Sequence, residues 1–180
     1  VAGELQVVPF DSMAGSAALG FMCREARQMA EQGCSIQKVV TRLENIRRKL
    51  TVVFTIDNLE FARLSGRISS LQGALVSLMR IKPIVVLKDG LLNMSERVRT
   101  RLRSLDRILD IVKEQVDQRK VTLAVVHAAD PDTARVLYER ALRIFNVKEI
   151  VLTELAIPVA ANLGPGTVGM VAYFSDNDEL

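Results

Sequence analysis

Residues 84–94 read IVVLKDGLLNM, in which two apolar runs flank the tripeptide Lys88, Asp89, Gly90. An Asp-Gly pair between apolar runs is a strong signal for a β-hairpin, because both residues tolerate the left-handed backbone that a two-residue turn requires. The stretch therefore predicts two antiparallel strands, over residues 84–87 and 91–94.

Outside the hairpin, five apolar runs have the length and composition of strands: residues 5–10, 51–56, 121–126, 149–152 and 170–174. Between the runs, apolar side chains recur at helical spacing, which predicts helices over residues 16–32, 35–46, 57–65, 69–79, 96–120 and 130–144 and a short one up to 161. Strands that alternate with helices indicate an α/β protein, and the hairpin makes its sheet mixed. The predicted fold is therefore a mixed α/β sheet with flanking helices.

Several helix ends carry recognisable signals. Ser35 and Asp130 stand at expected N-caps, where a side-chain oxygen accepts a backbone N–H. Pro131 follows in the first turn of its helix, and Gly33 is a suitable stop for the first helix. These signals fix helix boundaries better than periodicity alone.

Length and composition narrow the class of protein. The 180 residues are 49% hydrophobic and 25% charged, which suits one medium domain or one domain with part of another. A soft boundary near residues 48–49 divides the chain into 1–49 and 50–180. A net charge of +3 is too mild to imply nucleic-acid binding, and no apolar run approaches the ~20 residues that cross a bilayer.

The cysteines and the first residues suggest a location. Cys23 and Cys34 have the spacing of neither a metal site nor a disulfide framework, so a reducing, cytoplasmic location is expected. The first residues resemble no signal peptide, and the chain begins with Val1. We therefore expect either a processed chain or a fragment of a longer one.

The turn after residues 5–10 is the first candidate site. Asp11, Ser12 and small residues lead to a helix start near Ser16. Free N–H groups at a helix start suit a carboxylate or phosphate, and the Ser16 hydroxyl could add a donor. The competing interpretation is that Ser12 or Ser16 only caps the helix, which is the commoner role of such a serine.

Two further stretches could bind an anion. Arg67 follows Gly66 between two helical stretches, and its guanidinium fork matches an anion, although most single arginines are solvated. Residues 162–169 read NLGPGTVG, whose glycines formally match a dinucleotide fingerprint. A strand follows them instead of a helix, so we exclude nucleotide binding there. A backbone turn close to a ligand or to another segment stays a hypothesis.

Catalytic and metal-binding patterns are absent from the sequence. The single histidine, His127, closes an apolar run and has no evident acid or nucleophile partner, so a satisfied core-edge histidine is expected. The predicted helix 96–120 is rich in arginine but also carries several acidic residues, which favours a solvated or partner-binding face. No cofactor or metal is expected.

Taken together, four strings resemble the DegV family: FDSMAGSAALG at 10–20, TIDNLE at 55–60 with GRIS at 66–69, IKPI at 81–84 with Asp89-Gly90, and NLGPGTVG at 162–169. Each is weak alone, but their order and spacing cover nearly the whole chain. The resemblance implies a two-lobed α/β protein that holds a long-chain fatty acid between its lobes. It also implies, in many bacteria, a kinase partner that phosphorylates the bound acid.

The resemblance assigns roles to particular residues. Ser16 matches the family serine that binds the carboxylate, Arg67 matches the arginine of the Gly-Arg motif, and Asn162 occupies a position where the family usually has histidine. The turns at Gly15, Gly164 and Gly166 would lie near the head group. Compared with histidine, the asparagine keeps a hydrogen-bonding group but has no titratable one. This difference puts in doubt any role of residue 162 in phosphoryl transfer.

A further family motif, a Thr-Ser-x-Pro-Ser string, is not in this chain. We therefore expect residues 1–49 to be the remnant of an N-terminal lobe whose first half is missing, and residues 50–180 to be the C-terminal lobe. Without that half, lipid binding by the chain alone is expected to be weak.

The sequence thus predicts a cytoplasmic, bacterial fatty acid carrier rather than an enzyme, and brief contact with a membrane is compatible with that role. Two alternatives stay open. One is a small enzyme that binds a phosphorylated or carboxylated metabolite through the Ser16 and Gly164 turns. The other is an interaction module that uses the helix 96–120.

Overall fold

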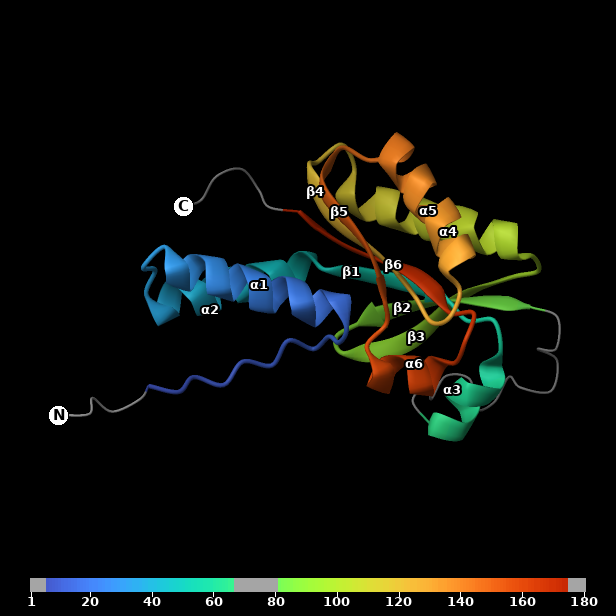
Figure 1. Ribbon diagram of the computed structural model, residues 1–180, viewed down its shortest axis with the longest axis horizontal. Helices are drawn as coiled ribbons and strands as arrows, with labels where there is room; N and C mark the ends of the chain where they lie inside the picture. The colour runs from blue at the N-terminus through green and yellow to red at the C-terminus, as the bar shows by residue number, and fades with distance from the viewer. Residues whose placement is uncertain (1–5, 67–80, 175–180) are drawn as a thin grey trace.

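The computed structural model describes residues 6–66 and 81–174. Within these residues, six strands form one sheet in the order β3-β2-β1-β6-β4-β5 (Figure 1). The strands are β1 (Thr51–Thr55), β2 (Lys82–Lys88), β3 (Leu91–Val98), β4 (Val121–His127), β5 (Val147–Glu154) and β6 (Val168–Phe174). Neighbours are antiparallel except for the parallel pair β4 and β5, so the predicted mixed α/β sheet is confirmed.

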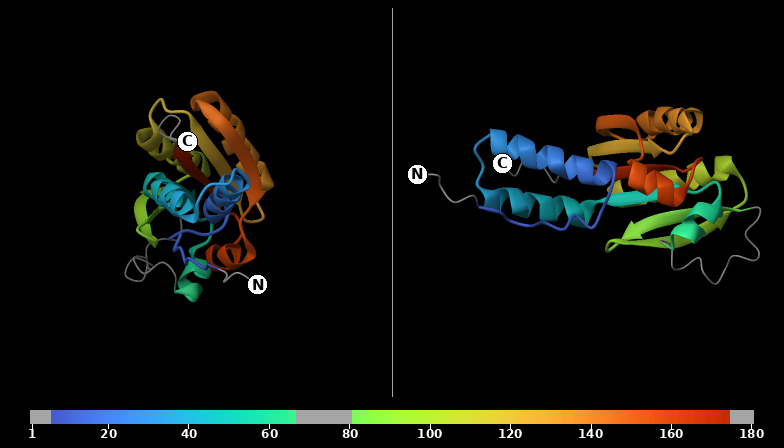
Figure 2. Two further views of the ribbon diagram at one scale, coloured as in Figure 1. Left: turned by 90° about the vertical axis from the view of Figure 1, so that its left-hand side faces the viewer. Right: turned by 60° about the horizontal axis from the view of Figure 1, so that its bottom comes forward.

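Helices cover both faces of the sheet. They are α1 (Ala17–Glu31), α2 (Ile36–Lys49), α3 (Leu59–Ser65), α4 (Arg101–Val116), α5 (Pro131–Ile144) and α6 (Ile157–Leu163). One face packs against α4 and α5, whereas α1, α2, α3 and α6 contribute to two clusters on the other face. The pair α1 and α2 also projects beyond the sheet, as Figure 1 and the right-hand view of Figure 2 show.

The β2–β3 hairpin forms as predicted. Asp89 and Gly90 have φ of 51° and 76°, the left-handed values of a two-residue turn. Val85 pairs with Met94 and Leu87 pairs with Leu92 across the hairpin. The local Asp-Gly signal was therefore sufficient to place both strands.

Predicted caps also form. The Ser35 side chain accepts from the Lys38 N–H, and the Asp130 side chain accepts from the Thr133 N–H at the start of α5. Gly66 ends α3 with φ of 65°, a left-handed value that glycine adopts without strain.

One predicted strand and the start of one predicted helix are wrong over the described residues. Residues 6–10 are extended but join no strand, and Val7 is 76% exposed, because no neighbouring strand takes up their hydrogen bonds. The helix predicted from residue 96 begins only at Arg101, because residues 96–98 pair with β2 and the Thr100 side chain caps the Arg103 N–H. The helix predicted over 69–79 lies outside the described residues.

The main core lies between the sheet and the two helices α4 and α5. It is built from alternate residues of the strands, including Val53, Leu123, Val125 and Met170, packed against buried residues of both helices such as Leu109. Alternation along each strand sends the intervening residues to the opposite face, where a second layer of apolar contacts forms. No helix within the described ranges is long and apolar enough to span a bilayer.

The α4 helix offers a direct test of this core. Leu109 is 3% exposed and Leu102, on the same helix, is 64% exposed. We expect Leu109→Ala to lower the free energy of unfolding by about 2–5 kcal/mol, because it removes buried surface and leaves a cavity. The same change at Leu102 should cost less than about 0.5 kcal/mol. Urea unfolding measures both, and similar losses would contradict the assigned packing.

Candidate functional site

A cavity of about 320 Å³ lies on the face of the sheet opposite α4 and α5. Its floor includes Val52, Phe54 and Val171 of the sheet, and its walls come from the β2–β3 hairpin, from α6 and from residues 13–16. A cavity of this size falls at the lower end of the range of small-molecule pockets. Its lining is almost entirely apolar, so it suits an apolar ligand.

Ser16 is the one lining residue, among those described, whose side chain carries an oxygen. It stands at the N-cap of α1, but its side chain makes no capping hydrogen bond. Instead, its Oγ accepts from the Ala156 N–H at 3.0 Å, so the hydroxyl connects the start of α1 to the start of α6. The capping interpretation is therefore wrong for Ser16, and the hydroxyl keeps its own hydrogen for donation.

The backbone at Ser16 is strained. Its φ of 53° and ψ of −134° lie in a region that residues with a Cβ rarely adopt. Met13, also in the cavity wall, has φ of 50°. Such strain persists only where the surrounding contacts impose it, and it is concentrated at functional sites.

The segment that precedes α1 is anchored by polar contacts to α2 and within itself. Arg47 Nη1 donates to the Asp11 carbonyl at 2.6 Å, and the Met13 N–H donates to Asp11 Oδ1 at 2.9 Å. The Ser12 hydroxyl donates to the Ala14 carbonyl at 2.9 Å. These contacts hold residues 11–16 against the mouth of the cavity and leave Ser16 to face it.

The remaining predicted site residues do not all reach the cavity. Gly15 lines it, where an added Cβ would lie 3.5 Å from Val159. The cavity lining includes Leu163 but not Asn162, Gly164 or Gly166, which lie within three positions of Leu163 along the chain. The Asn162 Nδ2 donates to the Pro158 carbonyl within α6. Arg67 lies outside the described residues.

Gly164 and Gly166 meet a steric requirement instead. Both have positive φ, of 85° and 78°, and an added Cβ would lie 2.5 Å from Phe61 Cδ2 and 2.6 Å from Asp57 Cβ, respectively. The turn they form is therefore packed closely against α3, at Phe61, and against Asp57 just before that helix. Sequence analysis identified the turn but not the neighbour that makes both glycines necessary.

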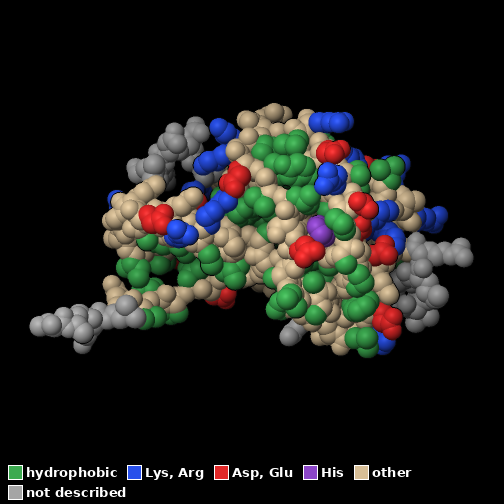
Figure 3. Space-filling model, viewed as in Figure 1, with side chains coloured by type: hydrophobic (Ala, Val, Ile, Leu, Met, Phe, Trp, Pro, Cys, Tyr) green, Lys and Arg blue, Asp and Glu red, His purple; other side chains and the backbone are tan. Residues whose placement is uncertain are grey.

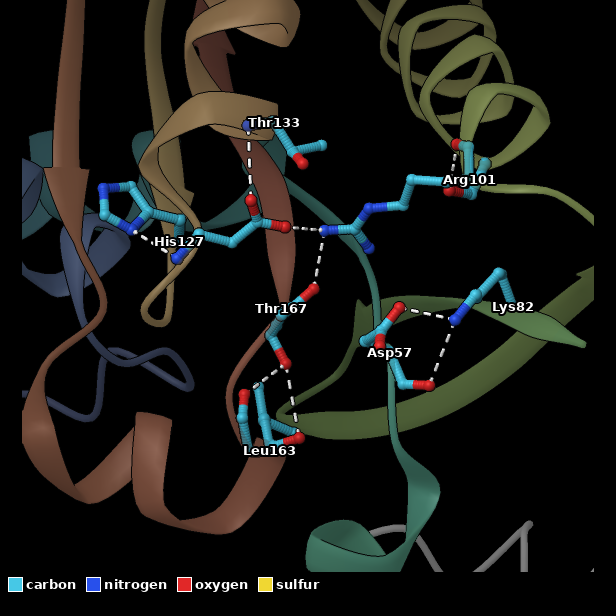
Figure 4. A network of polar contacts seen from close by, with 11 residues as sticks. Asp57, Lys82, Arg101, His127, Thr133, Leu163 and Thr167 are labelled. Carbon is cyan, nitrogen blue, oxygen red and sulfur yellow. Dashed lines mark hydrogen bonds and ion pairs between the residues drawn. The ribbon is translucent and has the colours of Figure 1, made fainter. Parts of the chain in front are cut away.

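Beside this turn lies a polar network that the sequence did not predict (Figure 4). Arg101 Nη2 lies 2.6 Å from both Asp130 Oδ2 and the Gly166 carbonyl. His127 Nδ1 accepts from the Asp130 N–H at 3.4 Å, and the His127 side chain is buried. His127 thus makes a structural contact with the backbone of Asp130. The charged side chains of the network are paired with one another, Arg101 with Asp130 and Lys82 with Asp57.

The arginines of the β3–α4 region are partly neutralised. Arg107 forms ion pairs with Glu96, Asp110 and Glu114, and its hydrogen bond lowers the pKa of Glu96 despite partial burial of that carboxyl. Arg140 of α5 likewise pairs with Asp106. This mixture of charges supports the interpretation of a solvated face.

Fold and site together define an α/β protein with an apolar cavity that carries one hydroxyl donor in its wall. Comparison with known proteins gives the family. The model of the DegV family, described as "Uncharacterised protein, DegV family", matches residues 1–175. The chain belongs to the DegV family.

Individual relatives agree with this assignment. The DegV domain-containing protein SCO2569 of Streptomyces coelicolor is 31% identical over 155 residues, which are 86% of this chain and 55% of that protein. A DegV family protein from Thermus thermophilus, described as fatty acid binding, superposes with a TM-score of 0.88 at 31% identity over 97% of this chain and 62% of that one.

DegV from Bacillus subtilis, described as a fatty acid binding protein, superposes with a TM-score of 0.80 at 26% identity, over 93% of this chain and 60% of that one. The chain therefore spans between 55% and 62% of the length of these three relatives.

Substitutions at Ser16 test the strain and the contact to Ala156. Ser16→Ala removes the acceptor but keeps a Cβ at positive φ, so we expect a loss of about 1 kcal/mol of unfolding free energy. Ser16→Gly removes the same hydroxyl but relieves the backbone, and should be more stable than Ser16→Ala by about 1 kcal/mol. Thermal or urea unfolding compares the two, and the reverse order would contradict a strained Ser16.

Asp130 gives a prediction on pH. Burial disfavours its carboxylate, but hydrogen bonds from Thr133 and Arg101 outweigh burial and lower the pKa of Asp130 below its usual 3.8. Because the folded state has the lower pKa, this stabilisation is present above about pH 4 and is lost as the pH falls through the folded value.

Asp130→Asn should therefore cost about 1–3 kcal/mol at pH 7, and the difference from wild type should narrow at pH 3. Asp132→Asn, an exposed position in the same turn, serves as the control. Unfolding in urea at the two pH values measures the effect, and a difference that stays constant with pH would contradict it.

Proposed function

We propose that this chain binds a long-chain fatty acid and carries it without transforming it. The observation that carries the proposal is the apolar cavity whose one described side-chain oxygen belongs to Ser16. Each methylene moved from water into such a cavity contributes about 0.8 kcal/mol, so an acyl chain has ample driving force. A small polar metabolite would lose its hydrogen bonds to water and find few partners in the apolar walls. The cavity therefore disfavours the alternative of a metabolite enzyme.

The carboxylate is the costly part of the ligand, because a charge removed from water must be hydrogen-bonded or paired. Ser16 has a free hydroxyl hydrogen beside the first turn of α1, which contains no acidic residue. The amides of that turn have no partner within the helix and favour an anion. Arg67, Asn162 and the turns at Gly15, Gly164 and Gly166 complete the proposed head-group contacts.

The relatives support this proposal through their described ligand. The Thermus thermophilus and Bacillus subtilis proteins are both described as fatty acid binding, and they superpose on this chain over more than nine-tenths of its length. The fold that carries the cavity here is therefore similar to that of proteins described as fatty acid binding. We propose the same ligand class here.

We also propose that the chain is the C-terminal portion of a two-lobed protein, with residues 1–49 belonging to the first lobe and residues 50–180 forming the second. The greater length of the relatives supports the proposal that the chain is a portion of a longer protein. So do the exposed apolar side chains Val7 and Leu19, at 76% and 41% exposure. Figure 3 shows further hydrophobic side chains exposed on the underside of the α1–α2 pair.

A bound fatty acid would present its carboxylate at the mouth of the cavity, where a partner enzyme can reach it. We propose a fatty acid kinase as that partner, and a cytoplasmic location in which the two meet. Asn162 cannot exchange a proton near neutral pH, so phosphoryl-transfer chemistry would fall to the partner.

The proposal is tested with the full-length protein that contains this chain. Native mass spectrometry of the purified protein should reveal a retained fatty acid. Ser16→Ala should weaken the affinity for a C16–C18 fatty acid by about 10–100-fold, the loss expected for one hydrogen bond to a charged group.

Ser35→Ala provides the matched control, because Ser35 caps α2 through the Lys38 N–H and does not line the cavity. It should leave the affinity unchanged. Absence of any retained or added fatty acid on the full-length protein would refute the proposed function.

A further inference from the structure

One guanidinium group joins three segments of the chain near the cavity. Arg101 is the first residue of α4, and its Nη2 atom lies 2.6 Å from Asp130 at the start of α5 and 2.6 Å from the carbonyl of Gly166, just before β6. Figure 4 shows the Arg101 side chain extending from α4, with dashed lines from its guanidinium to two acceptor atoms. Arg101 itself is not among the residues that line the cavity.

Hydrogen bonds relay this contact from Gly166 to the cavity wall. The Gly166 N–H donates to the Ala128 carbonyl, and the Ala128 N–H donates to the Thr167 carbonyl, both at 2.8 Å. The fully buried Thr167 hydroxyl donates to the carbonyls of Gly164 and Leu163, at 2.9 and 3.3 Å. Leu163 is the last residue of α6 and lines the cavity.

The opposite side of the turn is fixed as well. Gly166 packs so closely against Asp57 that an added Cβ would lie 2.6 Å from the Asp57 Cβ. Asp57 in turn is held by Lys82, whose Nζ lies 2.5 Å from Asp57 Oδ1. The turn therefore lies between two ion pairs, and only the Arg101 pair makes a direct hydrogen bond to its backbone among the contacts described.

We infer that Arg101 is a positioning residue for the ligand cavity: it holds the turn 164–167 and, through Thr167 and Leu163, sets the position of the α6 wall. This inference rests on the proposed function and deepens it, because it assigns ligand affinity to a side chain that does not touch the ligand. An acyl chain packed against Val159 and Leu163 depends on where that wall stands.

Arg140 provides a matched control in the same layer. Its Nη2 lies 2.6 Å from Asp106, the same separation as between Arg101 and Asp130. The side-chain exposures are also alike, at 30% and 33% for the Arg140 pair and 24% and 23% for the Arg101 pair. In both arginines the Nη1 atom is buried without a partner among the described residues. Among the described residues, the hydrogen bond and ion pair of Arg140 go to Asp106 and not to the turn 164–167, so Arg140 isolates the effect of that contact.

The experiment compares Arg101→Met with Arg140→Met in the full-length protein, using hydrogen–deuterium exchange and the affinity for a C16 fatty acid. Arg101→Met should increase exchange in the peptide that covers residues 157–168 and weaken fatty acid affinity at least 5-fold more than Arg140→Met. Arg101→Gln removes the charge that pairs with Asp130 but keeps a polar side chain, and it replaces Arg101→Met if that variant does not fold.

Equal effects of the two substitutions on affinity, or unchanged exchange over residues 157–168 in the Arg101 variant, would overturn the inference. Failure of the proposed function is distinguishable from this result. If wild-type protein binds no fatty acid, the proposed function is lost, and the exchange measurement alone then decides whether Arg101 holds the turn and the wall.

Discussion

The central strand β6 is the constraint on which the rest of the structure depends. It pairs with β1 on one side and β4 on the other, and all seven of its residues are buried. Gly169 lies so close to β1 that an added Cβ would stand 2.4 Å from the Phe54 Cβ and 2.6 Å from the Val53 carbonyl. Phe54 pairs with Gly169 and Val52 with Val171, so alternation along the strands puts Phe54 and Val171 on one surface, which is the floor of the cavity.

Because side chains alternate along a strand, β6 serves two cores at once. Met170 and Ala172 pack under α4 and α5, whereas Val171 and Tyr173 pack under α1 and α2. The α4–α5 face is closed by a large, continuous apolar cluster. The opposite face is divided between α1–α2 and α3–α6, and the space between these two groups is where the cavity lies. A binding site on this fold is therefore a consequence of covering one face of the sheet in two separate parts.

Polar groups are arranged around the cavity rather than in it. The ion pairs of Arg101 with Asp130 and of Lys82 with Asp57 stand beside the turn that ends α6, and the Arg47 contact anchors the segment before α1. Ser16 alone brings a side-chain oxygen to the described lining, at a strained backbone position. Such an arrangement keeps the walls apolar while its borders are held by directional contacts. It suits a protein of the DegV family whose proposed task is to hold a ligand rather than to react with it.

The sequence by itself determined the elements whose signals are local. The Asp89-Gly90 turn and the caps at Ser35 and Asp130 depend on residues at most four positions apart, and each lies where it was predicted. Ser16 was also a candidate from the small-residue turn before α1, and Gly15 from the family resemblance, and the structure places both in the cavity wall.

Only the tertiary structure decided the order of the strands, the cavity and the contacts of Ser16 and Arg101. The Ser16 hydroxyl meets an amide 140 positions further along the chain, and Arg101 meets a carbonyl 65 positions away. Residues 6–10 have the composition of a strand but no neighbour to pair with. Local patterns indicate which helix, strand or turn a segment can form. Pairing and packing between distant segments depend instead on the free energy of the whole fold.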